Sequence, residues 1–272
     1  MFRFLFHFAI FVFLTILTQI GGLAYLLVLI LRPRSLKSRF GKISSSLMIF
    51  LASYGVLWVT ASVSAPLFGR TPLPCIQSVS SNLVMQSPLY CVLNRHYVTP
   101  DMKAMAEQLG QAVEQKYPGS ITLALDANFP FWDGFPLLPH LSHDDGNKLD
   151  LAYYYQDRAK TYLPGRTRSP IGYWAFEGAH EDAGGPCTDR NDVLTLRWDL
   201  PWFEMFNRDY ELEPDRTQAA LNWLVNEGKS HGVSKIFVEP HLADTLNVED
   251  PIIRFQGCRA ARHDDHIHIQ IN

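Results

Sequence analysis

The chain has 272 residues, of which 47% are hydrophobic and 19% are charged, and its formal net charge is −3. No Asp or Glu precedes Asp101, and six of the 24 basic residues lie before residue 70, so residues 70–272 hold 18 basic against 27 acidic residues. Such an acidic domain argues against a nucleic acid partner, because proteins that bind nucleic acids present basic surfaces.

Two long apolar runs occupy the start of the chain, at residues 4–31 and 46–66. About 20 apolar residues are enough to cross a bilayer, so each run predicts a transmembrane helix. A cleaved signal peptide has an apolar core of only about 7 to 15 residues, which makes the first run too long for that interpretation. We therefore expect a membrane anchor over residues 1–69 and a single extramembrane domain over 70–272.

Charge predicts the orientation of this anchor. Arg3 is the only basic residue before the first run, whereas the connection between the two runs is strongly basic. The basic residues of the connection are Arg32, Arg34, Lys37, Arg39 and Lys42. Because positively charged loops stay in the cytoplasm, we expect the connection inside, and both the N-terminus and residues 70–272 outside.

Cysteine usage agrees with an extracytoplasmic domain. All four cysteines follow residue 70, and an even number of cysteines in an oxidising compartment predicts two disulfides. Three connectivities are possible, and four free buried thiols are the alternative. Proximity in sequence and the lack of a Cys-x-x-Cys spacing favour Cys75 with Cys91 and Cys187 with Cys258.

The elements expected after residue 95 predict an α+β fold, with helices flanking a central antiparallel sheet. Helices are expected from Pro100 to about Tyr117 and from Pro214 to about Glu227, because each begins with Pro and repeats apolar residues at helical spacing. Strands are expected at 121–125 and 236–238. No internal repeat and no glycine-rich nucleotide-binding motif interrupts this pattern.

A first cluster of candidate ligands lies between residues 139 and 150. It contains His140 and His143, and Asp150 follows in an alternating run that predicts a strand. Gly146 is expected to form the tight turn between the histidines and that strand. The cluster therefore places two imidazoles and one carboxylate close together in sequence.

The end of the chain holds a second cluster of candidate ligands. In a strand, His266, His268 and Gln270 share one face, and the isoleucines at 267, 269 and 271 share the other. Two imidazoles and a carboxylate, with water in a fourth position, are typical of catalytic zinc. We predict His143, Asp150 and His268 as the ligands of one zinc ion. The alternative is a histidine pair in the core with a capping carboxylate.

These residues resemble a family of zinc peptidases. His-x6-Asp followed far downstream by His-x-His is the pattern of the group that includes lysostaphin-type enzymes, D-alanyl-D-alanine carboxypeptidases and penicillin-insensitive murein endopeptidases. The chain is most similar to the last of these over roughly residues 95–272, at His140-x-x-His143, Gly146, Asp150 and the segment 263–268. Lys148 is a departure, because the murein endopeptidases carry an acidic residue there.

The resemblance and the alternation together suggest roles for the remaining polar residues. His266 lies on the expected metal-facing side, and we predict it as the general base or as a group that stabilises the transition state. Asp265 is the rival, since some members of the group use an acidic residue near the last ligand. His140 and His263 are expected to orient water or substrate beside the ligands.

The resemblance implies a zinc-dependent peptidoglycan peptidase, most simply a murein endopeptidase that cleaves peptide cross-links. Its partners would be peptidoglycan stem peptides, and it would sit in the bacterial cytoplasmic membrane with the catalytic domain on the periplasmic or extracellular face. No arginine matches the one that carboxypeptidases of the group use to hold a terminal carboxylate, which favours an endopeptidase. The alternatives are a D-alanyl-D-alanine carboxypeptidase, a catalytically inactive metal-binding module and a two-metal phosphoesterase.

Overall fold

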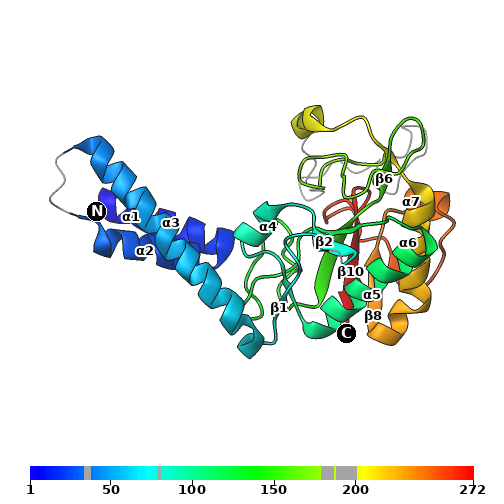
Figure 1. Cartoon of the computed structure of the whole chain (residues 1–272), viewed down its shortest axis with the longest axis horizontal. Helices are drawn as coiled ribbons and strands as arrows, with labels where there is room; N and C mark the ends of the chain where they lie inside the picture. The colour runs from blue at the N-terminus through cyan, green and yellow to red at the C-terminus, as the bar shows by residue number, and fades with distance from the viewer. Residues whose placement is uncertain (34–37, 79–80, 179–186, 188–200) are drawn as a thin grey trace.

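A computed structural model of the chain describes residues 1–33, 38–78, 81–178, 187 and 201–272. Three apolar helices form an elongated group at one end, and a domain of mixed helices and strands lies at the other (Figure 1). Among the basic residues of the expected cytoplasmic connection, Arg34 and Lys37 lie outside the described residues.

A six-stranded sheet forms the centre of the domain, with the strand order β2-β4-β5-β10-β8-β9. Its bounds are Leu83–Met85 for β2, Thr122–Ala124 for β4, Lys148–Ala152 for β5, Val233–Phe237 for β8, Ile253–Arg254 for β9 and His266–Ile271 for β10. The four middle strands pair antiparallel, whereas β2 and β9 join the two edges in parallel. The expected antiparallel sheet is confirmed for its centre, and the α+β class is confirmed.

Two helices supply most of the core on the apolar side of this sheet. α5 (Pro100–Lys116) and α6 (Pro214–Asn226) pack together beside β5 and β10 (Figure 1). Both begin as the sequence predicts, because the side chains of Thr99 and Glu213 accept backbone N–H groups of the first turn. The core contains the apolar face of each helix together with the alternate residues Leu149 and Leu151 of β5 and Ile267 and Ile269 of β10. Their polar neighbours therefore face the opposite side of the sheet.

The remaining elements are short. They are η1 (Ala65–Phe68), β1 (Thr71–Pro72), α4 (Pro88–Val92), β3 (Tyr97–Val98), β6 (Tyr155–Gln156), η3 (Pro201–Phe206), β7 (Glu211–Leu212), η4 (Gly228–His231) and α7 (Pro240–Thr245). β1 pairs with β3 and β6 pairs with β7, each as a separate two-stranded sheet.

The first apolar run is not the single helix that the sequence predicts. It forms α1 (Phe2–Thr18) and α2 (Gly21–Leu31), which meet at Gln19, whose φ is 66°. α2 folds back along α1 because Gly21 and Gly22 have no side chain: a Cβ on Gly22 would lie 2.0 Å from Thr15 Oγ1 and 2.7 Å from a backbone oxygen. Neither helix reaches the roughly 20 residues that span a bilayer.

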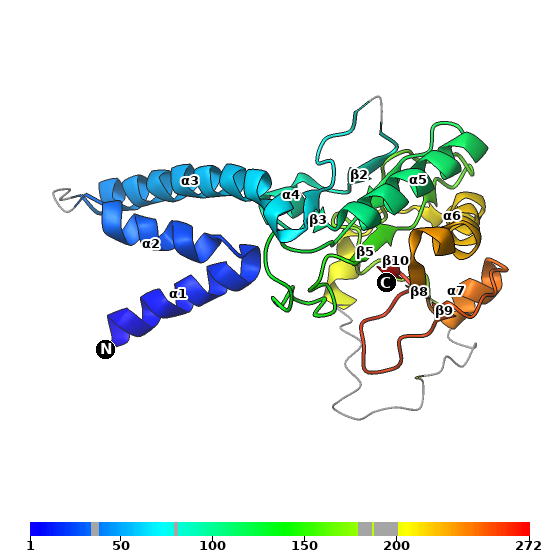
Figure 2. The ribbon, with the colours of Figure 1, turned by 90° about the horizontal axis from the view of Figure 1, so that it is seen from below.

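Only α3 (Arg39–Ser64), continued by η1, is long and apolar enough to cross a membrane among the described residues. The expectation of two transmembrane helices is therefore not confirmed. Because α2 reverses the direction of α1, the N-terminus, the end of α2 and the start of α3 lie at the same end of the helical group, away from the domain (Figure 2). This arrangement differs from the expected one, in which they lie on opposite sides of the membrane.

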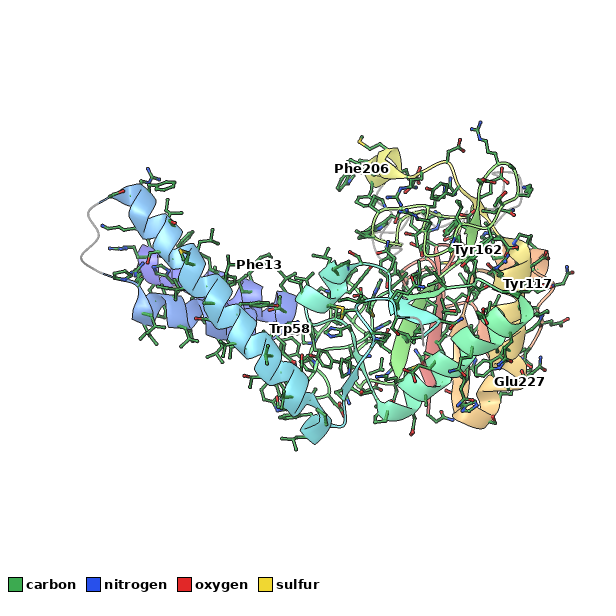
Figure 3. The ribbon with its side chains drawn as sticks, viewed as in Figure 1. Phe13, Trp58, Tyr117, Tyr162, Phe206 and Glu227 are labelled. Carbon is green, nitrogen blue, oxygen red and sulfur yellow. A yellow bond between two sulfur atoms is a disulfide. The ribbon has the colours of Figure 1, made fainter. Side chains whose placement is uncertain are left out.

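The helices are fixed to the domain by buried polar contacts. Trp58 of α3 donates its indole N–H to the carbonyl of Cys91 at 2.7 Å (Figure 3). At the α1–α2 bend, the fully buried Asn94 donates to the carbonyl of Thr18 at 3.2 Å, and Gln19 Oε1 accepts the N–H of Phe131 at 3.1 Å. Through Phe131, the bend between α1 and α2 thus contacts the segment that leads to His140.

Both expected disulfides are confirmed. Cys75 bonds Cys91 across 6.1 Å between Cα atoms, and Cys187 bonds Cys258 across 5.6 Å. The first closes a short loop beside the helical group. The second joins the segment before β10 to residue 187.

Candidate metal centre

The pairing of β5 with β10 sets the position of the site. His268 lies directly opposite Asp150 in the antiparallel register, and His266 lies opposite Ala152. Because side chains alternate along a strand, Asp150, His266 and His268 all point to the face away from the core helices. This part of the prediction follows directly from the sequence pattern.

His143 reaches the same point from the loop before β5. Gly146 adopts φ 83°, the turn expected of it, and its N–H donates to Asn128 Oδ1 at 2.9 Å. His143 Nδ1 donates to the carbonyl of Ala127 at 2.8 Å, which leaves Nε2 directed at the site. The loop is therefore folded so that one imidazole nitrogen is available as a ligand.

Three donor atoms form a compact triangle in this site. His143 Nε2 lies 3.1 Å from His268 Nδ1 and 3.2 Å from Asp150 Oδ1, and the last two atoms are 2.8 Å apart. A tetrahedral zinc ion with ligands at about 2.0–2.1 Å separates its ligand atoms by about 3.3 Å. The donor types and the spacing therefore allow these three residues to hold a metal ion.

His140 lies beside this triangle and adds a possible fourth donor. Its Nδ1 is 3.3 Å from Asp150 Oδ2 and 3.1 Å from Asp126 Oδ2. His140, His143 and Asp150 also place one donor atom each within 4.8 Å of one another, so they could hold a metal ion. The predicted place of His140 next to the ligands agrees with this geometry.

His266 and Asp265 form a pair in which the carboxylate holds the ring. Asp265 Oδ1 contacts His266 Nδ1, while its Oδ2 accepts the backbone N–H of Trp174 at 2.7 Å. The other ring nitrogen, His266 Nε2, lies 3.7 Å from Asp150 Oδ2. His266 thus faces the candidate ligands, and Asp265 lies behind it.

His263 packs on the site without joining the triangle. Its ring centroid lies 4.8 Å from that of His266 and 5.6 Å from that of His268. Its Nδ1 is buried and has no hydrogen-bond partner within the described part of the chain. Burial and the neighbouring histidines hold the pKa of His263 well below its usual value, so the ring is neutral.

The charge distribution of the site centres on Asp150, which is fully buried. Burial alone would raise the pKa of this carboxyl, but His143, His266 and His268 together hold it well below its usual value. Burial alone would lower the pKa of His266, yet Asp150 and Asp265 raise it to about 9. For His268, burial outweighs Asp150 and lowers the pKa to about 4. The site therefore keeps a buried carboxylate ionised and surrounded by imidazoles, as metal binding requires.

Two residues of the site were not predicted from the sequence. Tyr173 donates its hydroxyl hydrogen to Asp150 Oδ2 at 2.6 Å, and burial raises the pKa of Tyr173 so that it remains a donor. Asp126 forms a bidentate ion pair with the buried Arg95, at 2.6 and 2.7 Å, and lies next to His140. The position of Asp126 directly after the buried strand around β4 was a detectable signal, whereas nothing in the sequence pattern marks Tyr173.

Lys148, the departure from the family pattern, does not enter the site. Its Nζ pairs with Asp145 and lies 3.6 Å from Asp144 Oδ1. These contacts hold the ammonium group at the start of β5, on the turn. Lys148 therefore does not contact the triangle of His143, Asp150 and His268.

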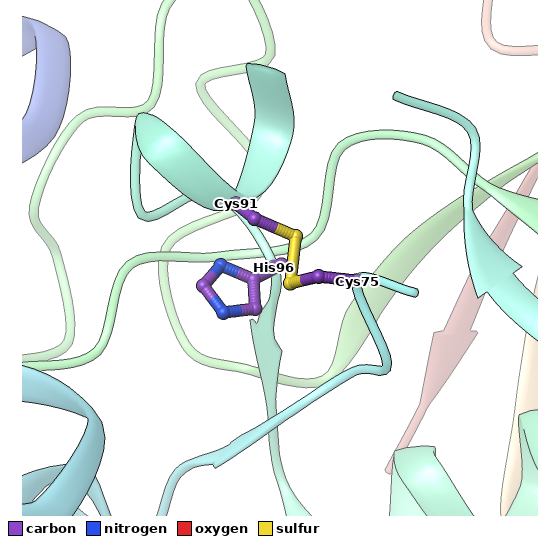
Figure 4. Close-up of side chains that lie close together, drawn as sticks. All are labelled: Cys75, Cys91 and His96. Carbon is purple, nitrogen blue, oxygen red and sulfur yellow. A yellow bond between two sulfur atoms is a disulfide. The ribbon is translucent and has the colours of Figure 1, made fainter. Parts of the chain in front are cut away.

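A second group of potential ligands, Cys75, Cys91 and His96, lies near the helical end of the domain (Figure 4). Its two sulfur atoms are bonded to each other. Thiolate is the form of cysteine that binds metals, so this group offers a metal only one imidazole while the disulfide is intact. His96 is better described as a core residue, stacked against Trp58.

A cavity of about 210 Å³ opens onto the metal triangle. Its walls include His143, His263, His266 and His268, together with the exposed Arg259. The candidate ligands are therefore accessible to a small part of a substrate.

No model of a known protein family matches the chain, and no curated protein matches it. The similarity to zinc peptidases therefore depends on the two motifs, and its functional consequences are argued as proposals.

Proposed function

We propose that this protein is a zinc-dependent peptidoglycan peptidase, most simply a murein endopeptidase. The observation that carries the proposal is the triangle formed by His143 Nε2, Asp150 Oδ1 and His268 Nδ1. Two neutral imidazoles and one carboxylate with a position left for water are the ligands of a catalytic rather than a structural zinc site. The motif resemblance supplies the substrate class.

In this proposal His143, Asp150 and His268 hold the zinc ion, which would polarise the scissile carbonyl and lower the pKa of the attacking water toward about 7. Tyr173 fixes the second oxygen of Asp150 and so orients the carboxylate. Gln270, whose amide lies 3.1 Å from His268 Nε2, holds the plane of that imidazole.

His266 would transfer the proton. Asp265 fixes Nδ1 of the ring, so Nε2 is the nitrogen that faces the ligands and the cavity. A bound zinc ion would lower the pKa of His266 from about 9, because a nearby positive charge disfavours the protonated ring. Its Nε2 would then accept the proton released as water attacks and give it to the amine of the leaving peptide. Asp265 has both oxygens engaged, by His266 and by the N–H of Trp174, which supports a positioning role for it rather than that of the base.

We also propose that α3 crosses the membrane and that the domain lies outside the cytoplasm, within reach of the cell wall. Arg3 and the basic connection after α2 would lie together at the inner end, in agreement with the positive-inside rule. A protease-sensitive tag at the N-terminus should then be protected in sealed right-side-out vesicles, whereas a tag at the C-terminus should be cleaved. Cleavage of the N-terminal tag would contradict this arrangement.

Mass spectrometry of purified cross-linked muropeptides, incubated with the full chain in detergent, tests the enzymatic proposal. We expect conversion of dimers to monomers that stops with a zinc chelator and returns when zinc is added. The variant His268→Ala should remain inactive after zinc is added. Intact dimers beside a protein that holds one zinc ion would identify an inactive metal-binding module instead.

One observation keeps a D-alanyl-D-alanine carboxypeptidase as a second candidate. Arg259 is exposed, lines the cavity over the ligands and forms no ion pair within the described ranges. A guanidinium group there can bind the terminal carboxylate of an uncross-linked stem peptide. Release of D-alanine from uncross-linked stems, lost in Arg259→Gln, would favour this activity.

A further inference from the structure

A second cavity lies beside the metal centre, and we propose that it is a subsite for an uncharged, apolar side chain of the substrate, next to the bond that is cleaved. This proposal rests on the proposed peptidase function for the reaction, but the binding it assigns is independent of turnover. The cavity has a volume of about 190 Å³. Pockets that enclose an entire small-molecule ligand are commonly about 300–1,000 Å³, so this one fits a single side chain.

The walls of the cavity are apolar and come from three separate segments. Leu89 and Leu93 belong to α4 and the residue after it, and Ile171, Trp174 and Phe176 come from the segment that carries Tyr173. Leu138, two residues before His140, supplies the third wall. A substrate side chain that enters would bury aliphatic or aromatic carbon against these walls, which stabilises binding by about 25 cal/mol per Å² of apolar area.

The charged groups that line the cavity each have a partner of opposite charge. Arg95 binds Asp126 through two hydrogen bonds, and Asp265 holds His266. Arg262 binds Asp264, and its guanidinium lies 4.0 Å from the centroid of the Phe176 ring. A charged side chain would therefore lose its hydration without gaining a counter-charge, so the cavity discriminates against lysine-like and acidic groups.

The position of the cavity relates it to the chemistry. His140 and His266 line both this cavity and the one over the metal triangle, together with Pro139 and Ala261. A peptide that passes over the triangle would thus have one flanking residue in the apolar cavity. The other flank would lie along the cavity over the triangle, whose lining includes the exposed Arg259. Of the two residues joined by the cleaved bond, the one with the apolar side chain would therefore lie nearer to α4.

α4 offers a matched pair of variants for the test. Leu89 and Val92 lie in the same short helix and are 50% and 55% exposed, but only Leu89 lines the cavity. Leu89→Trp should fill the cavity, and Val92→Trp adds the same group outside it. Melting temperatures of both variants in detergent establish that they remain folded.

The binding test uses N-trifluoroacetyl-D-leucine amide and its D-lysine counterpart as probes, with the full chain in detergent and with zinc removed. We expect fluorine-19 line broadening with the leucine probe, at least a fivefold smaller effect with the lysine probe, and loss of the broadening in Leu89→Trp but not in Val92→Trp. Equal broadening by both probes, or broadening unchanged in Leu89→Trp, would overturn the proposal. Because no zinc or hydrolysis is involved, a positive result stands even if muropeptides are not cleaved.

If muropeptides are cleaved, Leu89→Trp should raise KM at least tenfold for peptides with an aliphatic residue beside the cleaved bond, with kcat reduced less. Val92→Trp should leave both constants near those of the natural chain. A fall in kcat alone, with KM unchanged, would contradict a role in binding the side chain.

Discussion

The hydroxyl of Tyr173 donates a hydrogen bond to Asp150 Oδ2 at 2.6 Å, so the carboxylate is held at one oxygen by the phenol while its other oxygen faces His143 and His268. The same hydroxyl accepts the backbone N–H of Asp126 at 3.0 Å. Tyr173 therefore links the Asp150 carboxylate to the backbone of Asp126, in the segment after β4. Hydrogen bonds of this kind orient ligands and tune metal affinity.

We predict that Tyr173→Phe weakens zinc binding by about 10- to 100-fold, because the carboxylate of Asp150 loses the partner that fixes its orientation. Competition with a chromophoric chelator measures this affinity. Tyr162→Phe is the control, since that hydroxyl bonds to the backbone of Ile121, away from the site. Equal zinc affinity in the two variants would show that Tyr173 does not support the ligand.

We predict that His268→Ala abolishes stoichiometric zinc binding with the fold retained, because it removes one corner of the triangle. Atomic absorption of the purified chain and its circular dichroism measure the two properties. His231→Ala is a matched control, since His231 lies in η4, which packs against α5 and α6, and stacks on Trp223. One zinc ion per chain in His268→Ala would refute the ligand assignment.

Substitutions of His266 and Asp265 should differ in how much they lower kcat. We predict that His266→Ala lowers kcat by about 10²- to 10⁴-fold with zinc retained, because the proton acceptor is lost. Asp265→Asn should have a smaller effect, since the ring loses its orienting partner and keeps Nε2. Kinetics on cross-linked muropeptides, with zinc content measured in parallel, make the comparison. A larger loss in Asp265→Asn would assign the base to Asp265.

The sequence was sufficient for the parts of the site that depend on local periodicity. The alternation of histidine with isoleucine in the last strand, and of Asp150 with Leu149 and Leu151, predicts which side chains share a face. Burying both apolar faces together then places Asp150 and the histidines on one face, whereas the register that pairs His268 with Asp150 is an observation of the structure. The two disulfides were also favoured correctly by spacing alone.

Other features depend on contacts that no local pattern encodes. Tyr173 reaches Asp150 from an irregular segment, and its role follows only from tertiary packing. The bend at Gln19 was missed because mean hydropathy treats residues 4–31 as one run. At Gly21 and Gly22, α2 approaches the backbone atoms of α1 closely, and the run is broken there. Mean hydropathy does not detect such a contact. Gln-Ile-Gly-Gly was the available signal.

Lys148 is predicted to have a local role at the turn before β5. Lys148→Met should leave zinc affinity unchanged within about twofold, because the ammonium group contacts Asp144 and Asp145 and not the triangle. The same variant should lower the free energy of unfolding by at most about 1 kcal/mol, as expected for a partly exposed ion pair. Zinc titration and denaturant unfolding test both statements. A large loss of zinc affinity would mean that this position shapes the metal centre.

His96 should make the stability of the domain depend on pH. Its ring is 2% exposed, and burial lowers its pKa from 6.5 to about 4. Below pH 6.5 the unfolded chain therefore binds a proton that the folded domain excludes, so stability falls as the pH is lowered and the loss levels off near pH 4. At about 1.4 kcal/mol per pKa unit, the loss is about 3 kcal/mol.

The variant His96→Phe keeps an aromatic ring against Trp58 and Tyr97 and removes the titrating group. The free energy of unfolding, measured for both chains in denaturant with zinc removed, should show a difference between variant and natural chain that shifts in favour of the variant by about 3 kcal/mol from pH 7 to pH 4. Above pH 7 the difference should be constant, since His96 is then neutral in both states. Parallel pH curves for the two chains would mean that His96 is protonated equally in the folded and unfolded states.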